Sequence, residues 1–435
     1  MVGRRGPFVR CSPARPPAGS TVPIRRRSVL LGGIAVACAT ALARCGPAEA
    51  SSGNHPAGLL EVTCDWTSGP DRNGLQALLA ALKGHAPDVT FVTGDGSTDA
   101  DPLTRLATDR PPDSLRCAGG AELAELAPHL EPLDGLARRR RWTAGLPAGL
   151  RPRLRAGRAL HGVPAGVRRT NLLWSNPRVL ADAAADPAPA DPGLLIAQLQ
   201  RVTATGRPAL AVGGPAEVLQ LAETALLAAH GPDAFTALWQ PDGPWRTPAT
   251  TAALRVLDAL LAHAAPVTPD ADWTDAARLL GTGQAGYLLT GDWADGWLRE
   301  NLALRAGADY RWAAAPGTAA LFQSRADVFV LPRGAHHRDA ALAWLDVCAS
   351  LDGQIALNGA RAAVPARTDL PEPTRALFGP YARWSLDEWQ HGRPLDSLAH
   401  GGLLTPRRRT AALAAATAFT AHRDSTRLAR DLAAG

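Results

Sequence analysis

Apolar side chains change their spacing several times in the first part of the chain after residue 57. Residues 59–65 form a short apolar run that ends in polar residues, a pattern that predicts a strand. Leucines then recur at helical spacing over 75–82, and residues 88–92 again read as a strand. A strand, a helix and a strand at this spacing predict a βαβ unit, which implies a parallel sheet covered by helices.

The alternation continues toward the C-terminus. Further strands are predicted at 112–117, 160–163, 170–174, 287–289 and 327–331. Leucine- and alanine-rich helical faces occupy 121–126, 193–204, 215–230, 250–263 and 274–281, and helices dominate from 337 onward. Residues 183–193, rich in Pro, Asp and Ala, predict a surface loop. The fold class is therefore α/β, and 435 residues are too many for one ordinary core, so we expect two or three lobes.

The positive charge of the chain is concentrated at its N-terminus. Residues 1–45 hold eight arginines and no acidic residue, which leaves 38 basic against 40 acidic residues elsewhere. A nucleic-acid-binding protein keeps a basic face on its folded part, so we expect no nucleic-acid partner. Arg26-Arg27-Ser28 followed by an apolar run over 29–43 predicts a twin-arginine export signal, with a short N-terminal membrane anchor as the alternative.

The cleavage site of this signal has three candidates. Residues 42–45 resemble a lipobox, in which Cys45 would be lipidated, although Arg44 departs from the small residue usual before that cysteine. Cys38 is a second candidate, and simple cleavage near Ala50 is a third. We expect residues 1–45 to be the signal and 46–57, rich in Gly, Pro, Ser and Ala, to be a flexible tether.

Motifs with a defined chemistry are weak in this chain. Residues 281–286 fit G-x-G-x-x-G, but a helix is predicted before them and a strand after them, the reverse of a dinucleotide site. His336-His337 lacks further ligands at metal spacing and is interpreted as a solvated turn. Cys64, Cys117 and Cys348 are interpreted as buried thiols, with a Cys64–Cys117 disulfide as the alternative. No cofactor or metal is expected.

Tryptophan usage indicates a different chemistry. The chain has 12 Trp against 3 Tyr and 7 Phe, and several predicted strand ends or loops carry one, at 66, 174, 245 and 293. Indole rings stack on the apolar faces of pyranoses, and a neighbouring carboxylate, as at Asp292-Trp293, accepts hydrogen bonds from hydroxyls. For any single Trp, packing in the core is the alternative. A glycosidase with a pair of convergent carboxylates is the competing function class.

Ten short stretches together carry a family resemblance. They are residues 65–69, 111–113, 120–126, 162–164, 169–174, 291–294, 314–318, 326–327, 364–369 and 397–401. In this order, from Glu61 to His400, the chain resembles the carbohydrate ABC-transporter solute-binding proteins, and within them the glucose/mannose-type group. The resemblance implies a two-lobed periplasmic-binding-protein-like fold with a helical C-terminus, whose lobes close on a solute in the cleft between them. It implies an exported, non-enzymatic monomer that hands its solute to ABC permease subunits; a ligand sensor for a membrane receptor is the alternative.

The resemblance also implies lobe boundaries and contact positions. One lobe would comprise 58–165 plus 317–372, the other 166–316 plus 373–435. The expected sugar-contacting residues are Trp66, Asp71, Arg116, Arg168, Asp292, Trp293, Asp327, Arg361 and His400. Trp66 or Trp293 would stack on the sugar ring, the aspartates would accept from its hydroxyls, and His400 would donate or accept one hydrogen bond.

Three of these positions depart from the family. Arg116, Arg168 and Arg361 stand where Gln, His or Lys is usual, with Arg325 as a fourth candidate, and the Trp expected after Gly214 is absent. Glucose as the ligand therefore does not follow. One hypothesis is an anionic solute, such as a uronate or a sugar phosphate, held by guanidinium forks. The other is drift toward arginine, with the new side chains paired to Asp71, Asp292 or Asp327.

Overall fold

A computed structural model describes residues 58–93, 102–266 and 271–434. The export signal, the candidate cleavage sites at Cys38, Cys45 and Ala50, and the tether all lie outside these ranges. The predicted βαβ unit is confirmed: β1 (Gly58–Thr63) and β2 (Val89–Thr93) are parallel neighbours, joined by α2 (Gly69–His85). Helix α2 buries the leucines at 75, 78 and 82, which is why their helical spacing was informative.

The larger sheet has six strands. Its order is β12-β11-β3-β1-β2, with β6 also paired to β11. The strands not yet introduced are β3 (Ser114–Cys117), β6 (Gly162–Arg169), β11 (Leu321–Val330) and β12 (Arg393–Asp396). Strand β11 is antiparallel to β3 and β6 and parallel to β12, and its register on β6 shifts between Asp327 and Val328. This irregularity falls at one of the expected site residues.

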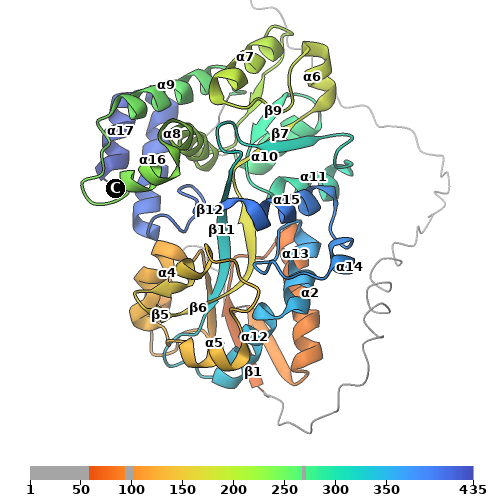
Figure 1. The fold of residues 1–435 in the computed structure, drawn as a ribbon, viewed down its shortest axis with the longest axis vertical. Helices are drawn as coiled ribbons and strands as arrows, with labels where there is room; N and C mark the ends of the chain where they lie inside the picture. The colour runs from red at the N-terminus through yellow and green to blue at the C-terminus, as the bar shows by residue number, and fades with distance from the viewer. Residues whose placement is uncertain (1–57, 94–101, 267–270, 435) are drawn as a thin grey trace, which may run out of the picture. The chain divides into compact units, whose positions relative to one another are not determined.

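The smaller sheet has four strands, in the order β10-β7-β9-β8. They are β7 (Leu172–Ser175), β8 (Leu210–Ala211), β9 (Tyr287–Leu289) and β10 (Arg311–Ala314). Strand β7 follows β6 after only two residues, and β10 precedes β11 closely, so the long strands β6 and β11 lead from one sheet to the other (Figure 1). A short hairpin of β4 (Arg155–Ala156) and β5 (Ala159–Leu160) stands apart from both sheets.

Helices cover both sheets and form the C-terminus, as predicted (Figure 1). The remaining helices are α3 (Pro102–Leu106), α4 (Gly120–Leu126), η2 (Ala127–His129), α5 (Asp134–Arg140), η3 (Arg151–Leu154), α6 (Pro177–Ala183), α7 (Pro192–Thr203), α8 (Pro215–Leu238), α9 (Pro248–Ala262), α10 (Trp273–Gly281), α11 (Trp293–Leu302), α12 (Arg338–Ala349), α13 (Leu351–Arg361), α14 (Glu372–Arg375), α15 (Pro380–His391), α16 (Pro406–His422) and α17 (Ser425–Ala434). The helix predicted over 215–230 ends where Gly231 adopts a φ of 71° before Pro232, although α8 resumes beyond that break.

Two hydrophobic clusters form the core. One surrounds the six-stranded sheet, with Leu60 and Phe329 fully buried, and extends to Trp174 of the smaller sheet. The other lies among α8, α9, α16 and α17, around Leu226 and Phe419. The predicted lobe boundaries stay a prediction, and one element falls differently from them: β12, assigned to the second lobe, pairs with β11 in the sheet of the first.

Several smaller expectations are settled by the structure. Gly281 ends α10 and β9 begins at Tyr287, so the G-x-G-x-x-G stretch is a turn between a helix and a strand, as interpreted. Cys64, Cys117 and Cys348 are buried free thiols, so the alternative Cys64–Cys117 disulfide is wrong. The turn at His336-His337 is not purely solvated, because the His337 ring lies 3.0 Å from an Asp113 carboxylate oxygen.

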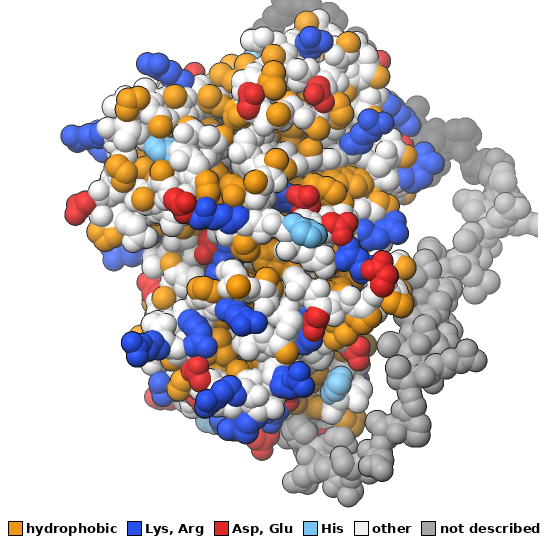
Figure 2. Space-filling model, in the orientation of Figure 1, with side chains coloured by type: hydrophobic (Ala, Val, Ile, Leu, Met, Phe, Trp, Pro, Cys, Tyr) orange, Lys and Arg blue, Asp and Glu red, His pale blue; other side chains and the backbone are white. Residues whose placement is uncertain are grey.

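Surface charge is mixed. Figure 2 shows basic and acidic side chains interspersed over the face that it presents. Within the described residues, no single helix is long and apolar enough to cross a membrane, although α12 and α13, which meet at an angle of 69°, pass such a test together by length and composition.

Candidate functional site

The nine expected sugar-contacting residues come from eight parts of the chain. Each lies at or near the end of an element or at an irregularity of a strand. Trp66 follows β1, Asp71 lies in the first turn of α2, Arg116 is in β3, Arg168 in β6, Asp292 and Trp293 begin α11, Asp327 is in β11, Arg361 ends α13, and His400 follows β12. Contacts between their side chains join all nine into one cluster, described in the following paragraphs.

Asp327 is the centre of one half of the cluster. Its Oδ1 accepts from Arg116 Nη1 at 2.8 Å and its Oδ2 from Arg361 Nη2 at 2.5 Å, while Arg325 Nη2 lies 3.6 Å from Oδ1. The carboxylate is completely buried, and so is Arg361. Space for Arg361 depends on Gly166, because a Cβ there would lie 2.8 Å from the Arg361 guanidinium and 2.1 Å from the Asn358 amide oxygen.

Arg168 joins the other half of the cluster. Its Nε donates to Asp292 Oδ1 at 2.7 Å, and its Nη1 lies 2.5 Å from Asp71 Oδ1. Asp292 begins α11, yet its side chain does not cap that helix; its Oδ2 accepts from the Arg169 amide at 2.9 Å instead. Arg168 therefore bridges the start of α2 and the start of α11, two helices that also contact each other.

Burial and charge act together on these groups. Burial opposes ionisation of Asp327, but Arg361, Arg116 and Arg325 hold its pKa well below the usual range. Burial alone would lower the pKa of Arg168, yet Asp71 and Asp292 raise it above the ordinary value. Asp327 and Arg168 are therefore charged in the folded protein, whereas burial raises the pKa of Asp292 to about 6 against the opposing effect of Arg168. Arg168 and Arg325 also stand directly opposite one another on β6 and β11, a like-charge pair that the aspartates offset.

The two tryptophans have different surroundings. Trp66 is 2% exposed, and the Arg361 guanidinium carbon lies 4.5 Å from the centroid of its ring. The expectation that Trp66 presents a free stacking face is therefore not met in this conformation, because a guanidinium covers the ring. Trp293 is half-buried, with its centroid 4.6 Å from that of His400, and Gly291 must lack a side chain because its Cβ would lie 2.2 Å from the indole.

His400 has a defined tautomer. Gln220 Nε2 donates to the Thr170 carbonyl, so Gln220 Oε1 is the acceptor for His400 Nε2 at 2.7 Å. Burial, with Arg325 and Arg409, lowers the pKa of His400 to about 3, so the ring is neutral. His400 Nε2 is thus a donor already used by Gln220, and the ring offers a solute its Nδ1 lone pair as an acceptor.

Buried polar atoms without a hydrogen-bond partner concentrate in this cluster. Among the described residues they include Trp66 Nε1, Arg116 Nε, Trp293 Nε1, Arg325 Nε, Arg361 Nε and Arg361 Nη1. All are donors. Buried donors normally find acceptors, so such a concentration points to a place where a ligand with acceptor oxygens binds.

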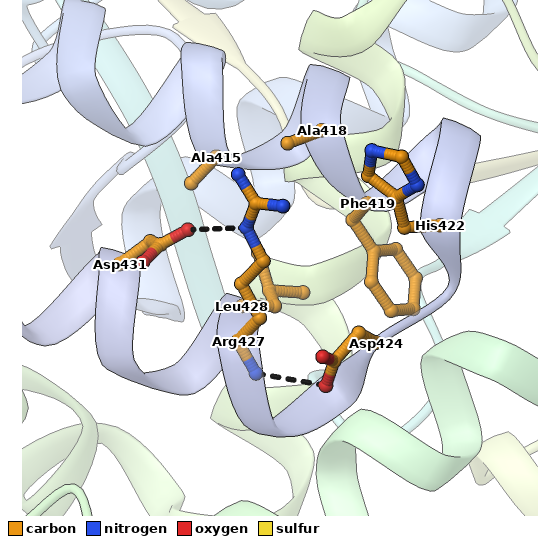
Figure 3. Close-up of a pocket in the computed structure, with 8 residues that line it drawn as sticks. All are labelled: Ala415, Ala418, Phe419, His422, Asp424, Arg427, Leu428 and Asp431. Carbon is orange, nitrogen blue, oxygen red and sulfur yellow. Dashed lines mark hydrogen bonds and ion pairs between the residues drawn. The ribbon is translucent and has the colours of Figure 1, made fainter.

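Two hollows of the structure lie beside or away from this cluster. A pocket of about 500 Å³ is lined by Trp66, α2 and β2, and contains none of the other eight expected residues. A smaller hollow lies between α16 and α17, where Arg427 is bonded to Asp424 and Asp431, and shares no residue with the cluster (Figure 3). At the cluster itself, ion pairs fill the space between the side chains.

Sequence reasoning missed two members of the cluster and only touched on a third. Asp65 Oδ1 lies 2.6 Å from Arg116 Nη2, and Gln220 holds His400. Arg325 had been named only as an additional candidate. Asp65 was detectable, since it stands beside Trp66 at the same strand end. Gln220 had a weaker signal, as one of several polar residues among the apolar residues of helix α8.

Comparisons with known proteins bear on the family and the fold of this chain. A curated relative, an uncharacterised ABC-transporter extracellular-binding protein of Pyrococcus horikoshii, is 24% identical over 359 residues, 79% of each chain. The xylose/arabinose-binding protein XacG of Haloferax volcanii is 26% identical over 376 residues, 82% of this chain and 80% of its own.

Solved structures share the fold. The bacterial solute receptor AcbH, described as having an exclusive preference for β-D-galactopyranose, has a TM-score of 0.76 at 17% identity, with 86% of this chain and 96% of that one covered. A chitin oligosaccharide binding protein has a TM-score of 0.75 at 17% identity, over 87% and 98% of the two chains. The expected two-lobed solute-binding fold is thereby confirmed. The sequence model of one family matches residues 66–355, more than half of the chain, and the chain therefore belongs to the bacterial extracellular solute-binding proteins.

Proposed function

We propose that this protein captures a neutral sugar at the nine-residue cluster and delivers it to an ABC importer. As a member of its family it is a solute-binding receptor, not an enzyme, and it is exported. The site assignment depends on the concentration of buried N–H groups without a hydrogen-bond partner around the ion pairs. Sugar hydroxyls both accept and donate, so they suit a site that holds unpaired N–H groups next to carboxylates.

The charge balance of the cluster supports a neutral solute. Four guanidinium groups, at 116, 168, 325 and 361, face four carboxylates, at 65, 71, 292 and 327. This is the pairing that the hypothesis of drift toward arginine predicted. An incoming anion would add an uncompensated charge to a buried, balanced network, which is costly in a medium of low polarity. A neutral sugar leaves the balance unchanged.

Two partly exposed carboxylates are the natural first contacts for the solute. The side chains of Asp71 and Asp65 are 34% and 46% exposed, and each uses one carboxylate oxygen for an arginine in the described ion pairs. Their second oxygens can accept from sugar hydroxyls. Trp293 supplies the aromatic face, because the Arg168 guanidinium carbon lies 5.8 Å from its ring centroid, farther than the 4.5 Å between Arg361 and Trp66.

The Arg168–Asp71 contact has a further role in this proposal. It joins the start of α2 to a residue that also binds the start of α11, so it holds together the elements that the solute itself would bridge. A solute that competes with Arg168 for Asp71 would replace the Arg168–Asp71 contact by its own contacts to both helices. The solute then drives closure only by the amount by which its contacts favour the closed state over the open state in free energy.

Finer features extend the proposal. The twin-arginine route through Arg26-Arg27, lipidation of Cys45 and a monomeric state would place a single receptor on the outer face of the membrane. Membership of the glucose/mannose-type group is part of the same proposal, without glucose as a necessary ligand, because Arg116, Arg168 and Arg361 replace the residues usual there.

A screen for thermal stabilisation tests the function. The mature protein is heated with neutral sugars, sugar acids, sugar phosphates and polyols, and a ligand at a hundred times its dissociation constant adds about 2.7 kcal/mol to the free energy of unfolding. We expect saturable stabilisation by a neutral sugar with no product formed from it. Turnover of a glycoside, or stabilisation by phosphates alone, would contradict the proposal.

A further inference from the structure

One buried carboxylate lies outside the ion-pair cluster but contacts two segments that carry residues of the cluster. Glu223, in the middle of α8, has a relative exposure of 0% and no arginine partner among the described ion pairs. Instead it accepts from four neutral donors: the Leu398 amide, the Ala399 amide at 3.4 Å, the Ser397 hydroxyl at 3.0 Å and the Gln323 amide group at 2.8 Å. Helix interiors rarely bury a carboxylate without such compensation.

These donors belong to two segments that carry site residues. Three of them lie in the turn 397–399, directly before His400, and the Ser397 hydroxyl also accepts from the His400 amide at 3.1 Å. The fourth, Gln323, lies in β11, which continues to Arg325 and Asp327. One turn earlier on α8, Gln220 holds the His400 ring. Positions three apart share one face of a helix, so α8 presents Gln220 and Glu223 together to this turn.

We propose that Glu223 is a positioning residue of the solute site, which fixes the turn 397–399 against β11 and thereby sets the place of His400 beside Trp293. The proposal rests on the proposed function, because His400 and Trp293 matter to it as solute contacts. Glu223 itself does not touch the solute. Its ionised form offers the lone pairs that four donors require, and no other group on α8 reaches both segments through a carboxylate.

A second glutamate on the same helix provides a matched comparison. Glu217 is also buried, at 4% exposure, but its carboxylate accepts from the Gly214 amide at the start of α8 and makes no contact with the turn 397–399. Burial raises the pKa of both carboxyls to about 7; hydrogen bonds from Leu398, Ser397 and Ala399 oppose the shift at Glu223. Glu217 and Glu223 are thus both buried and have similarly raised pKa values, but only Glu223 binds the turn 397–399.

Titration of Glu223 makes the position of the turn depend on pH. When the carboxyl gains a proton as the pH falls through about 7, one oxygen becomes a donor and faces another donor. The elements around it carry His400, Arg325, Asp396 and Arg409 as further titratable groups. His400 is neutral in this range, since its pKa is about 3, and the arginines stay charged. Asp396 pairs with Arg153 and not with Glu223.

Protonation of Glu223 is expected to weaken solute binding but to increase the free energy of unfolding. Because the pKa of Glu223 in the folded protein exceeds its ordinary 4.5, the folded state binds the proton first as the pH falls. The contribution of Glu223 to the free energy of unfolding therefore increases as the pH falls from 7 to about 4.5. Weaker sugar binding over this interval then reports a displaced turn and not an unfolding protein.

The test compares Glu223→Gln with Glu217→Gln in the full mature chain. Exchange of the Leu398 and Ala399 amide hydrogens is followed by NMR or mass spectrometry, and sugar affinity is measured by calorimetry between about pH 8 and pH 6. We expect Glu223→Gln to accelerate exchange at these two amides, to weaken sugar binding about tenfold, and to remove the step in affinity near pH 7. Glu217→Gln should leave all three unchanged. If the two variants behave alike, the proposal is wrong.

A third variant covers the case in which Glu223→Gln does not fold. Ser397→Ala keeps the carboxylate but removes the hydroxyl that links it to the His400 amide, and should weaken sugar binding while it keeps the step near pH 7. Normal affinity in Ser397→Ala would count against the proposal. If the wild-type protein binds no sugar, the proposed function fails, whereas the amide exchange rates still decide whether Glu223 positions the turn.

Discussion

Arginine–aspartate pairs occur in two settings in this protein, and the contrast between them separates a site from a surface. At the nine-residue cluster, Arg168 and Asp292 are 3% and 0% exposed. On α17, Arg427 and Asp431 form the same kind of pair at 3.3 Å with 47% and 32% exposure (Figure 3). The exposed pair is an i,i+4 contact within one helix, whereas Arg168 and Asp292 lie 124 positions apart in the sequence.

The physical difference lies in desolvation. An exposed pair gives up little hydration and contributes little, whereas each buried ion loses several kcal/mol of hydration that only close, well-oriented partners can offset. Apolar residues of similar size would often be as stable in the buried place. A buried network that still leaves several N–H groups unpaired is therefore poorly explained by stability alone, and this favours a binding role.

The largest expected effect is the loss of Asp327. Asp327→Asn removes the charge that faces Arg116, Arg361 and Arg325, and leaves buried guanidinium groups without compensation. We expect the free energy of unfolding to fall by about 3–5 kcal/mol, measured by denaturant titration. A loss below about 1 kcal/mol would mean that the cluster behaves like the surface pair.

Acid should affect the two settings unequally. The pKa of Asp327 is lowered by its arginines, so the stabilisation it supplies is present above its ordinary value of 3.8 and is lost as the pH falls below that value. Acid unfolding curves of the wild type and Asp327→Asn should therefore converge toward low pH. Curves that stay parallel would show that Asp327 is not the ionised centre of the cluster.

A smaller effect is expected at the rim of the cluster. Asp71→Asn keeps the Arg168–Asp292 pair but removes the partly exposed carboxylate proposed to accept from the solute. A lost hydrogen bond to a charged group corresponds to about 1.5–3 kcal/mol, so calorimetry should find sugar binding at least about tenfold weaker. Unchanged affinity would remove Asp71 from the site and leave it only a bridging role.

The smallest effect is expected on α17. Asp431→Asn should change the free energy of unfolding by at most about 1 kcal/mol and leave sugar affinity as it is. The same denaturant and calorimetric measurements serve here as the matched control for the two variants above. A large loss of stability would show that burial does not distinguish the two settings.

The sequence allowed the local elements to be predicted well. Helical leucine spacing located α2, and the apolar runs before and after it located β1 and β2, because these elements bury one recognisable face. The G-x-G-x-x-G stretch was correctly interpreted as a turn, since the order of helix and strand was readable. Short edge strands such as β8 and β12 were missed, because two to four residues carry no periodicity.

The nine residues expected at the site lie together in the structure, but their contacts could not be predicted from the sequence. The resemblance named nine residues, and the structure brings them together. Which arginine pairs with which aspartate depends on side-chain reach and burial, which the sequence does not encode locally. Trp66 illustrates the limit: its position at a strand end suggested an open aromatic face, and only the tertiary structure places Arg361 over it. Glu223 likewise became informative only when its four donors were visible.

The most direct test of the account is a calorimetric titration of the mature protein with neutral sugars and with the matching uronates, at low and at moderate salt. The account predicts saturable binding of a neutral sugar that is insensitive to ionic strength, is weakened at least about tenfold in Asp71→Asn and is unchanged in Asp431→Asn. Binding of a uronate alone, weakened by salt and abolished by Arg168→Gln, would contradict it, because the arginines would then serve an anionic solute and not their aspartate partners.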